Sequence, residues 1–240
     1  NSTLNFQEIL YISMPHRTDR QDALSLLAAV SGIKLTLIPG VWCWRAHANA
    51  WRYIIDNDVQ TALIVEDDID WDVNIKEIMG LWGWQLRFNN TIRWGENVEK
   101  GWEDECPYSC DWDELWMGQC GNTVNKKRLD LHWTYSDPNG PDIGSTIEGF
   151  QKEFRDIWNI TGGDGMRVTS ATYGPLCTMG YAVSRMGAMR MLYHIGGWHG
   201  MGFPVDNEIA FKTEDGYISG YTMTPPVFTP WRVGGSRDTD

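Results

Sequence analysis

The segment Thr61-Ala-Leu-Ile-Val-Glu-Asp-Asp68 constrains the fold more than any other part of the sequence. Its first five residues are apolar or β-branched, which is typical of a short strand buried on both faces of a parallel sheet. Three acidic residues follow at once, so this strand would deliver carboxylates to the sheet edge where open α/β sheets bind ligands. The segment predicts an α/β fold with an acidic site at the end of one strand.

Strand and helix patterns alternate before this segment. A short apolar strand over residues 9–12 precedes a capping box, Thr18-Asp-Arg-Gln21, and an amphipathic helix that Gly32 ends. A second strand is expected over residues 33–38, because apolar positions alternate there before Pro39-Gly40. The order strand, helix, strand predicts a parallel crossover.

Similar patterns return along the chain. Residues 44–55 carry tryptophan and histidine at helical spacing, which predicts a second helix. A strand is expected over residues 176–183, followed by a helix with Ser184 as its N-cap. Residues 218–228 predict a late strand, in which Pro225-Pro226 must lie at a sheet edge or a strand end.

Residues 81–134 show no clear periodicity and hold seven of the 14 tryptophans and three of the five cysteines. We treat residues 81–165 as an irregular Trp/Cys-rich insert, on the acceptor side of a single domain that spans residues 1–240. Five cysteines cannot all pair within one chain, so one or two disulfides and at least one thiol are expected. The less favoured alternative is a zinc site, because the spacing fits zinc poorly, with these four ligands: Cys106, Cys110, Cys120 and His132.

The chain carries 20 basic and 32 acidic residues, and this net charge of −12 repels phosphate backbones and anionic membrane surfaces. Nucleic acid is therefore not an expected partner, and no apolar run is long enough to cross a bilayer. The start at Asn1, without Met or a signal-like segment, is typical of a trimmed chain and compatible with an anchor upstream. Three glycosylation sequons, at Asn1, Asn89 and Asn159, favour the lumen of the secretory pathway.

The acidic segment itself predicts a metal site. Alternation along an extended chain puts Glu66 and Asp68 on one face of the strand and Asp67 on the other. Carboxylate oxygens favour a hard cation, so Mn²⁺ or Mg²⁺ is expected between Glu66 and Asp68. The alternative is a solvated strand end, because the acids at positions 66, 68, 70 and 72 simply alternate. The metal site is favoured because the preceding strand should be buried.

Other candidate residues come from the helices. Arg17 and Arg20 lie at the start of the first helix, where free N–H groups and the helix dipole would receive a nucleotide diphosphate. The alternative is that both are surface charges. His47 lies between tryptophans on an apolar helix face, which favours a core histidine over a ligand or base. Asp206 is a candidate base or only a helix N-cap, and Glu208 is the second candidate base.

Eight short segments between residue 9 and about residue 230 match one known pattern. They are Ile12-Ser-Met-Pro-His-Arg-Thr-Asp-Arg20, Ile38-Pro-Gly-Val41, Cys43-Trp-Arg-Ala-His47, Ala62-Leu-Ile-Val-Glu-Asp-Asp68, Leu115-Trp-Met-Gly-Gln-Cys120, Gly180-Tyr-Ala-Val-Ser-Arg-Met-Gly-Ala188, Pro204-Val-Asp206 and Pro225-Pro226. In this order they resemble glycosyltransferase family 25, the lipooligosaccharide and procollagen galactosyltransferases. Residues 81–165 depart most from that pattern, so the resemblance does not extend to the acceptor.

The resemblance implies a GT-A fold, a Rossmann-like nucleotide-binding sheet flanked by helices, with Mn²⁺ and a UDP-sugar donor, typically UDP-galactose. It also implies inversion at the anomeric carbon. Glu66 to Asp68 would form the DxD-like metal motif, with Glu66 on the ion or on the ribose, and Asp206 matches an aspartate that is a base candidate in the family. The expected donor-binding residues are Ile12, Ser13, Arg17, Arg20, His47, Glu66, Asp67 and, in the basic C-terminal segment, Arg232.

Together these features predict a metal-dependent inverting glycosyltransferase. It would move a hexose, with galactose favoured, from a UDP-sugar to a hydroxyl group of a glycan or glycoprotein in the Golgi lumen. Two alternatives use the same acids and aromatic rings: a carbohydrate-binding domain without catalysis, and a glycoside hydrolase. The transferase is favoured because the arginine-bearing helix start has no role in either alternative.

Overall fold

A computed structural model describes residues 1–94, 106–122, 124–162, 164–197 and 202–231. Its centre is an eight-stranded sheet in the order β2-β1-β3-β8-β5-β9-β7-β6. The strands are β1 (Glu8–Ser13), β2 (Thr36–Pro39), β3 (Thr61–Glu66), β5 (Glu114–Gly118), β6 (Trp133–Ser136), β7 (Met166–Ala171), β8 (Gly180–Ser184) and β9 (Gly220–Thr224). A small second sheet pairs β4 (Ile69–Trp71) with β10 (Phe228–Pro230).

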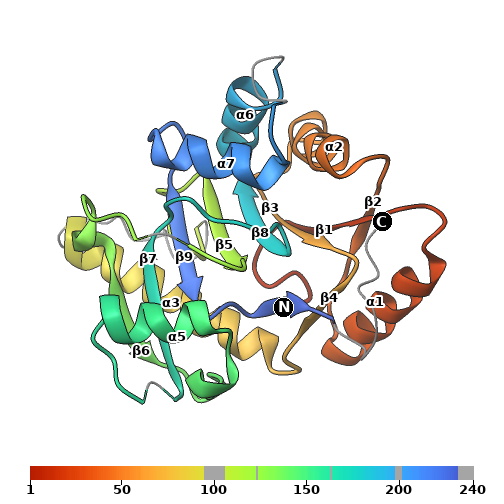
Figure 1. The fold of residues 1–240 in the computed structure, drawn as a ribbon. Helices are drawn as coiled ribbons and strands as arrows, with labels where there is room; N and C mark the ends of the chain where they lie inside the picture. Colours follow the sequence, from red (N-terminus) through yellow and green to blue (C-terminus); the bar gives the residue numbers. More distant parts are fainter. Residues whose placement is uncertain (95–105, 123, 163, 198–201, 232–240) are drawn as a thin grey trace.

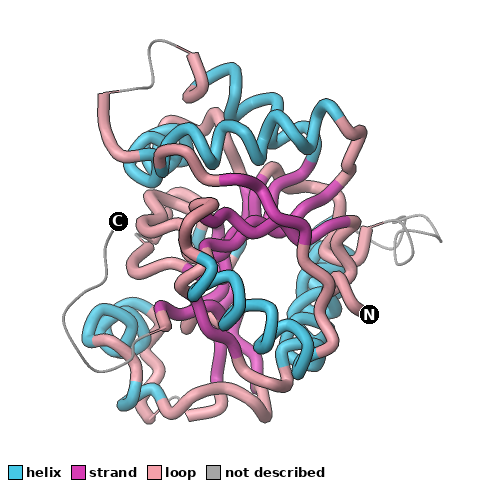
Figure 2. Tube along the Cα trace, turned by 90° about the vertical axis from the view of Figure 1, so that its right-hand side faces the viewer, coloured by secondary structure: helices cyan, strands magenta, loops and turns pink. Residues whose placement is uncertain are grey.

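Helices cover both faces of the central sheet, as Figure 1 and the turned view of Figure 2 show. One face carries α1 (Thr18–Ser31) and α3 (Ile75–Trp94). The opposite face carries α2 (Cys43–Asp56), α6 (Arg185–His194) and α7 (Val205–Glu214). Short helical turns lie near the β6 edge: η1 (Leu129–Leu131), η2 (Ile143–Ser145), α5 (Glu148–Lys152) and η3 (Glu153–Ile157). The expected α/β class, with a sheet flanked by helices, is confirmed.

The direction of the strands changes across the sheet. β1 is parallel to both β2 and β3, so the expected parallel crossover is confirmed. β8 runs antiparallel to β3 and to β5, whereas β9 is parallel to β5. β7 is antiparallel to β9 and to β6. Within this sheet, β8 and β7 therefore oppose the direction that the other six strands share.

Strand β3 separates two apolar cores. Leu63 and Val65 pack in the core beneath α1 and α3, whereas Ala62 and Ile64 pack in the core beneath α2 and α6. All four side chains are buried, which confirms the prediction of a strand covered on both faces.

The first helix begins differently from the prediction. Thr18 is the first residue of α1 and Arg17 is the N-cap, which makes no side-chain cap bond, so the expected capping box is wrong. The Gln21 amide instead donates to the Ser13 hydroxyl at 3.2 Å and to the Met14 carbonyl at 2.9 Å, and so ties α1 to the end of β1. Gly32 ends the helix in the left-handed conformation, as expected.

The expectation of an irregular insert over residues 81–165 is wrong for much of that range. Residues 81–94 continue α3, in which Trp82 and Leu86 are buried against the sheet. β5 lies near the middle of the central sheet, and β6 forms its edge. Gly83 obscured the helical pattern in the sequence. Glycine is required there because the loop at Pro107 approaches closely: an added Cβ would lie 2.7 Å from the Pro107 carbonyl oxygen.

Disulfides join Cys106 to Cys110 and Cys120 to Cys177, and Cys43 is a free thiol. The expected number of disulfides and the free thiol are thus confirmed, and all three cysteines of the zinc alternative are oxidised. Two disulfides indicate a secreted or lumenal protein. In the parts of the chain that the structure describes, no helix has both the length and the apolar character that a membrane crossing requires.

Candidate functional site

The acidic segment lies at the point where the order of the parallel strands reverses. The chain runs from β1 to β2 on one side of β1 and then returns to β3 on its other side. In open α/β sheets, ligands bind beyond the carboxyl ends of the strands at such a reversal. Ile12, next to the last residue of β1, is paired in register with Glu66 at the end of β3. The carboxylates therefore lie at the position where this topology favours a binding site.

Glu66 and Asp67 serve opposite faces of the sheet. Glu66 continues the row of Ala62 and Ile64 toward α2, and Asp67 follows the row of Leu63 and Val65 toward α1. β3 ends at Glu66, so Asp67 and Asp68 lie in the tight turn before β4 and not in an extended strand. The expected alternation holds for Glu66 and Asp67. The expectation that Asp68 shares the face of Glu66 is wrong, because the turn brings Asp68 to Arg20, beside Asp67.

On the α2 face, two donors meet the same oxygen of Glu66. The Thr178 hydroxyl donates to Oε1 at 2.5 Å, and His47 Nε2 lies 3.5 Å from that oxygen. Burial raises the pKa of Glu66, but the hydrogen bonds from His47 and Thr178 and the charge of Arg20 lower it below its ordinary value. Glu66 is thus held as a carboxylate.

On the α1 face, Arg20 binds both remaining acids. Its Nη1 lies 3.0 Å from Asp67 Oδ1 and 3.6 Å from Asp68 Oδ2. Arg20 and Asp67 are buried, whereas the Asp68 side chain is 39% exposed. Burial and the charge of Glu66 raise the pKa of Asp68, and Arg20 opposes part of that shift. Asp68 is therefore the most accessible and the least compensated of the three carboxylates.

The carboxylates of this turn are of the ligand type that a hard divalent cation prefers. Arg20 contacts Asp67 and Asp68 and acts on Glu66 through its charge alone, so the three carboxylates and one guanidinium leave two formal negative charges. Their oxygens are hard ligands, and Mg²⁺ and similar ions often bind one or two carboxylates and complete their coordination with water and substrate phosphates. Among the described residues, no group of three His, Cys, Asp or Glu side chains is arranged to hold a metal by itself.

Asp206 lies in the same region, although it is distant in sequence. It is the second residue of α7 and not its N-cap, which is Pro204, so the interpretation as a cap is wrong. The backbone N–H of Cys177 donates to its Oδ2 at 3.0 Å. Desolvation raises the pKa of the Cys43 thiol to about 11, and the charges of Glu66 and Asp206 add to that effect. The charges of Glu66 and Asp206 therefore both raise the pKa of Cys43, the first residue of α2.

The other predicted site residues are Ser13, Arg17, Glu208 and Arg232. Ser13 is buried at the end of β1, beside the candidate site. Arg17 is mostly buried and binds both oxygens of Asp19, at 3.0 and 2.9 Å. Glu208 is a buried residue of α7. Arg232 lies outside the described residues, but the Trp231 N–H donates to the Asp68 carbonyl at 2.6 Å, so the chain that precedes Arg232 reaches the acidic turn.

Sequence reasoning missed three residues of the site. Thr178 and Cys177 come from the loop before β8, and neither carries a local signal of its contact with Glu66 or Asp206. Tyr181, on β8, binds His47 and was noticed only as part of a matching segment. The disulfide between Cys120 and Cys177, which holds this loop, was the one available clue, but its pairing was not predicted.

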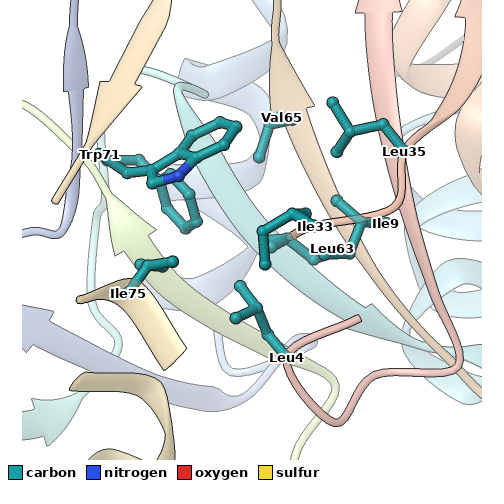
Figure 3. Close-up of a pocket in the computed structure, with 9 residues that line it drawn as sticks. Leu4, Ile9, Ile33, Leu35, Leu63, Val65, Trp71 and Ile75 are labelled. Atoms are coloured by element: carbon teal, nitrogen blue, oxygen red, sulfur yellow. The ribbon is translucent and has the colours of Figure 1, made fainter. Parts of the chain in front are cut away.

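Two cavities among the described residues lie away from this site. The pocket in Figure 3 has a volume of about 10 Å³ and is lined only by apolar side chains beneath β1 and β3. It is a packing defect at the limit of what one water needs. A polar cavity of about 390 Å³ lies at the opposite end of the sheet, where Gln60 precedes β3. Arg190 on its wall is paired with Asp113 at 2.6 Å.

Comparisons with known proteins add little to this picture. No family model and no curated protein matches the chain. One solved structure, that of A197 from STIV, is similar to 92% of this chain and 83% of its own, with 11% sequence identity and a TM-score of 0.40. A similarity of that size carries no argument about fold family or function.

Proposed function

We propose that this protein is a metal-dependent inverting glycosyltransferase with a GT-A fold, similar to glycosyltransferase family 25. It would transfer a hexose, with galactose favoured, from a UDP-sugar to a hydroxyl group of a glycan or glycoprotein. The observation that carries the proposal is the cluster of Glu66, Asp67 and Asp68 at the strand reversal between β1 and β3. The disulfides indicate a secreted or lumenal protein, and the compartment we propose is the Golgi lumen.

Glu66 and Asp68 are the proposed ligands of Mn²⁺ or Mg²⁺. Asp67 remains with Arg20, which is buried with it and keeps the turn in place. When bound, the cation would offset the charge that develops on the departing diphosphate. Arg20 lies between Asp67 and Asp68, so it limits the repulsion among the three carboxylates while leaving two negative charges for the ion.

Residues around the acidic cluster are proposed to bind the donor. Ile12 and Ser13 are the last two residues of the neighbouring strand β1. The nucleotide is proposed to bind beyond this strand end, next to Glu66. His47 would act through Glu66, which it contacts. Arg17 and Arg232 are proposed to approach the diphosphate from the start of α1 and from the C-terminal segment. Trp231, which is bonded to the acidic turn, leads into that segment.

Asp206 is the proposed general base. The Cys177 N–H holds one of its oxygens, and its own helix holds the other through the Asn207 N–H at 2.9 Å. A carboxylate fixed in this way can accept the proton of an acceptor hydroxyl as that hydroxyl attacks the sugar. Glu208 is the second candidate, but its burial makes it harder for an acceptor to reach.

A panel of nucleotide sugars tests the proposal. The purified protein should release free nucleotide from one of them when Mn²⁺ and a hydroxyl acceptor are present, and EDTA should abolish the release. Asp68→Asn should lose this activity and keep its fold. Asp70→Asn is the matched control: it removes the next acid along the chain, which accepts from the Trp71 N–H, and it should remain active. Turnover that survives in EDTA or in Asp68→Asn would refute the proposal.

A further inference from the structure

We infer that Tyr181, held by Trp51, fixes the tautomer of His47 and thereby orients Glu66, so that one carboxylate oxygen is kept available for a cation. The inference about the cation rests on the proposed function, whereas the orientation of His47 stands on the contacts alone. Tyr181 and Trp51 are positioning residues here, because neither contacts the proposed metal or substrate. These three side chains are almost fully buried on the α2 face of the sheet.

The contacts form an unbroken chain from the core to the site. The Trp51 indole Nε1 donates to the Tyr181 hydroxyl at 2.9 Å. That hydroxyl lies 2.9 Å from His47 Nδ1, and His47 Nε2 lies 3.5 Å from Glu66 Oε1. Tyr181 is held further by stacking on Trp116, with ring centroids 5.1 Å apart and planes 17° from parallel.

The number of hydrogen bonds that each group can donate and accept then assigns the protons of Tyr181 and His47. An indole N–H only donates, so Trp51 occupies one lone pair of the Tyr181 oxygen. The single phenolic proton is left to donate, and His47 Nδ1 is the acceptor within bonding distance. Neutral His47 therefore carries its proton on Nε2, and this N–H faces the Glu66 carboxylate. The opposite tautomer would set a nitrogen lone pair against the carboxylate.

The orientation of Glu66 depends on which of its two carboxylate oxygens is contacted. His47 and Thr178 both contact Oε1, one from α2 and the other from the loop before β8. Neither contact involves Oε2. The carboxylate is thus anchored through one oxygen by α2 and by the loop before β8, and Oε2 takes part in neither contact. Partners that orient a metal ligand commonly change metal affinity or activity about 10-fold to 100-fold when removed.

Nitrogen-15 NMR of histidine-labelled wild-type protein at neutral pH tests the proton assignment directly. His47 should show an unprotonated Nδ1 and a protonated Nε2, with its signals assigned by their loss in His47→Asn. In Tyr181→Phe this pattern should change, because Nδ1 loses its donor. A wild-type spectrum with the proton on Nδ1, or on both nitrogens, would overturn the inference even if the variant fails to fold.

Calorimetric titration with Mn²⁺ tests the consequence for Glu66. We expect Tyr181→Phe to weaken Mn²⁺ binding about 10-fold or more. Tyr221→Phe is the matched control: it also removes a buried phenol, which is bonded to Asp111 at 2.8 Å on the other face of the sheet. This control should lose stability but not Mn²⁺ affinity, and equal loss of affinity in both variants would refute the positioning role. A wild-type protein that binds no Mn²⁺ but shows the expected tautomer would refute the proposed function and leave the orientation of His47 intact.

Discussion

At the scale of single residues, the acidic cluster divides structural and chemical duties between neighbours. Asp67 is buried with Arg20, and Asp68 is accessible one residue later. A buried ion pair that loses one member leaves the other charge uncompensated, whereas an accessible carboxylate can be lost at little cost to stability. The two positions should therefore give opposite phenotypes, although the sequence presents them as equivalent acids.

Asp67→Asn should destabilise the fold by about 3 kcal/mol, because the buried Arg20 would lose its charged partner at 3.0 Å. Asp68→Asn should leave the free energy of unfolding almost unchanged and reduce Mn²⁺ binding. Urea denaturation of both variants measures the first quantity, and calorimetric titration the second. Equal stability of the two variants would contradict this division of duties.

Glu114 provides a pH-dependent prediction at the same scale. It is fully buried in β5, and neither of its oxygens has a hydrogen-bond donor in good geometry among the described residues. Burial raises its pKa from 4.5 to about 8; the adjacent Trp116 opposes this shift and the charge of Asp113 adds to it. Between those two pH values the folded chain holds a proton that the unfolded chain releases, so the stability contribution of Glu114 falls as pH rises through this window.

Glu114→Gln should remove that loss. We expect the variant and the wild type to differ little in stability near pH 4.5, and the variant to be more stable at pH 8 and above, by up to about 5 kcal/mol. The difference between the two proteins, measured by urea denaturation across this range, cancels the contributions of other groups. A difference that does not change with pH would show that Glu114 is ionised in the folded protein.

At the scale of elements, the disulfide between Cys120 and Cys177 connects the fold to the site. It joins the end of β5 to the loop before β8, and the Cys177 N–H holds Asp206. It closes a sequence separation of 57 residues, whereas the disulfide between Cys106 and Cys110 spans four. Loop-closure entropy assigns about 4 kcal/mol to the longer loop and about 2 kcal/mol to the shorter one.

Replacing Cys120 and Cys177 together by serine should therefore destabilise the protein more than replacing Cys106 and Cys110. The first double variant should also lose activity, because the loop that orients Asp206 and Thr178 is released, whereas the second should keep it. Guanidinium denaturation and nucleotide release from the active donor measure the two effects. A double variant of Cys120 and Cys177 with full activity would show that the loop needs no tether.

The elements also show which parts of the fold the sequence could predict. Three elements could be predicted from local sequence patterns. β3 is a strand buried on both faces, α2 has a helical face that carries tryptophan, and α6 begins at a serine cap whose hydroxyl accepts from the Gly187 N–H. β5 was missed because Glu114 is a charged residue in a central strand, which contradicts any hydrophobic pattern. The acidic end of β3 could likewise be predicted from neighbouring residues. The contact between Cys177 and Asp206 could not, because it joins residues 29 positions apart and leaves no periodic pattern in the sequence.

At the scale of the whole molecule, the site is assembled from distant parts of the chain. The turn after β3 supplies the carboxylates, α7 supplies Asp206, and the Trp231 N–H, just past β10, binds the Asp68 carbonyl. The three parts are adjacent only when the sheet is complete, so a ligand that binds them binds the folded state alone. Such a ligand must raise the unfolding temperature by mass action.

Mn²⁺ and UDP should therefore stabilise the protein together. At 100 times its Kd, a ligand specific for the folded state adds about 2.7 kcal/mol, which for a chain of this size raises the Tm by about 5 to 10 °C. Because Asp68 is proposed to hold the cation that would offset the charge of the diphosphate, UDP should produce this shift only with Mn²⁺ present, and EDTA should reverse it. Differential scanning fluorimetry of the wild type and of Asp68→Asn, in all four combinations of the two ligands, measures the coupling. If UDP shifts the Tm equally in EDTA, or in Asp68→Asn, the nucleotide binds without the acidic cluster, and the cluster then has no role in holding the donor.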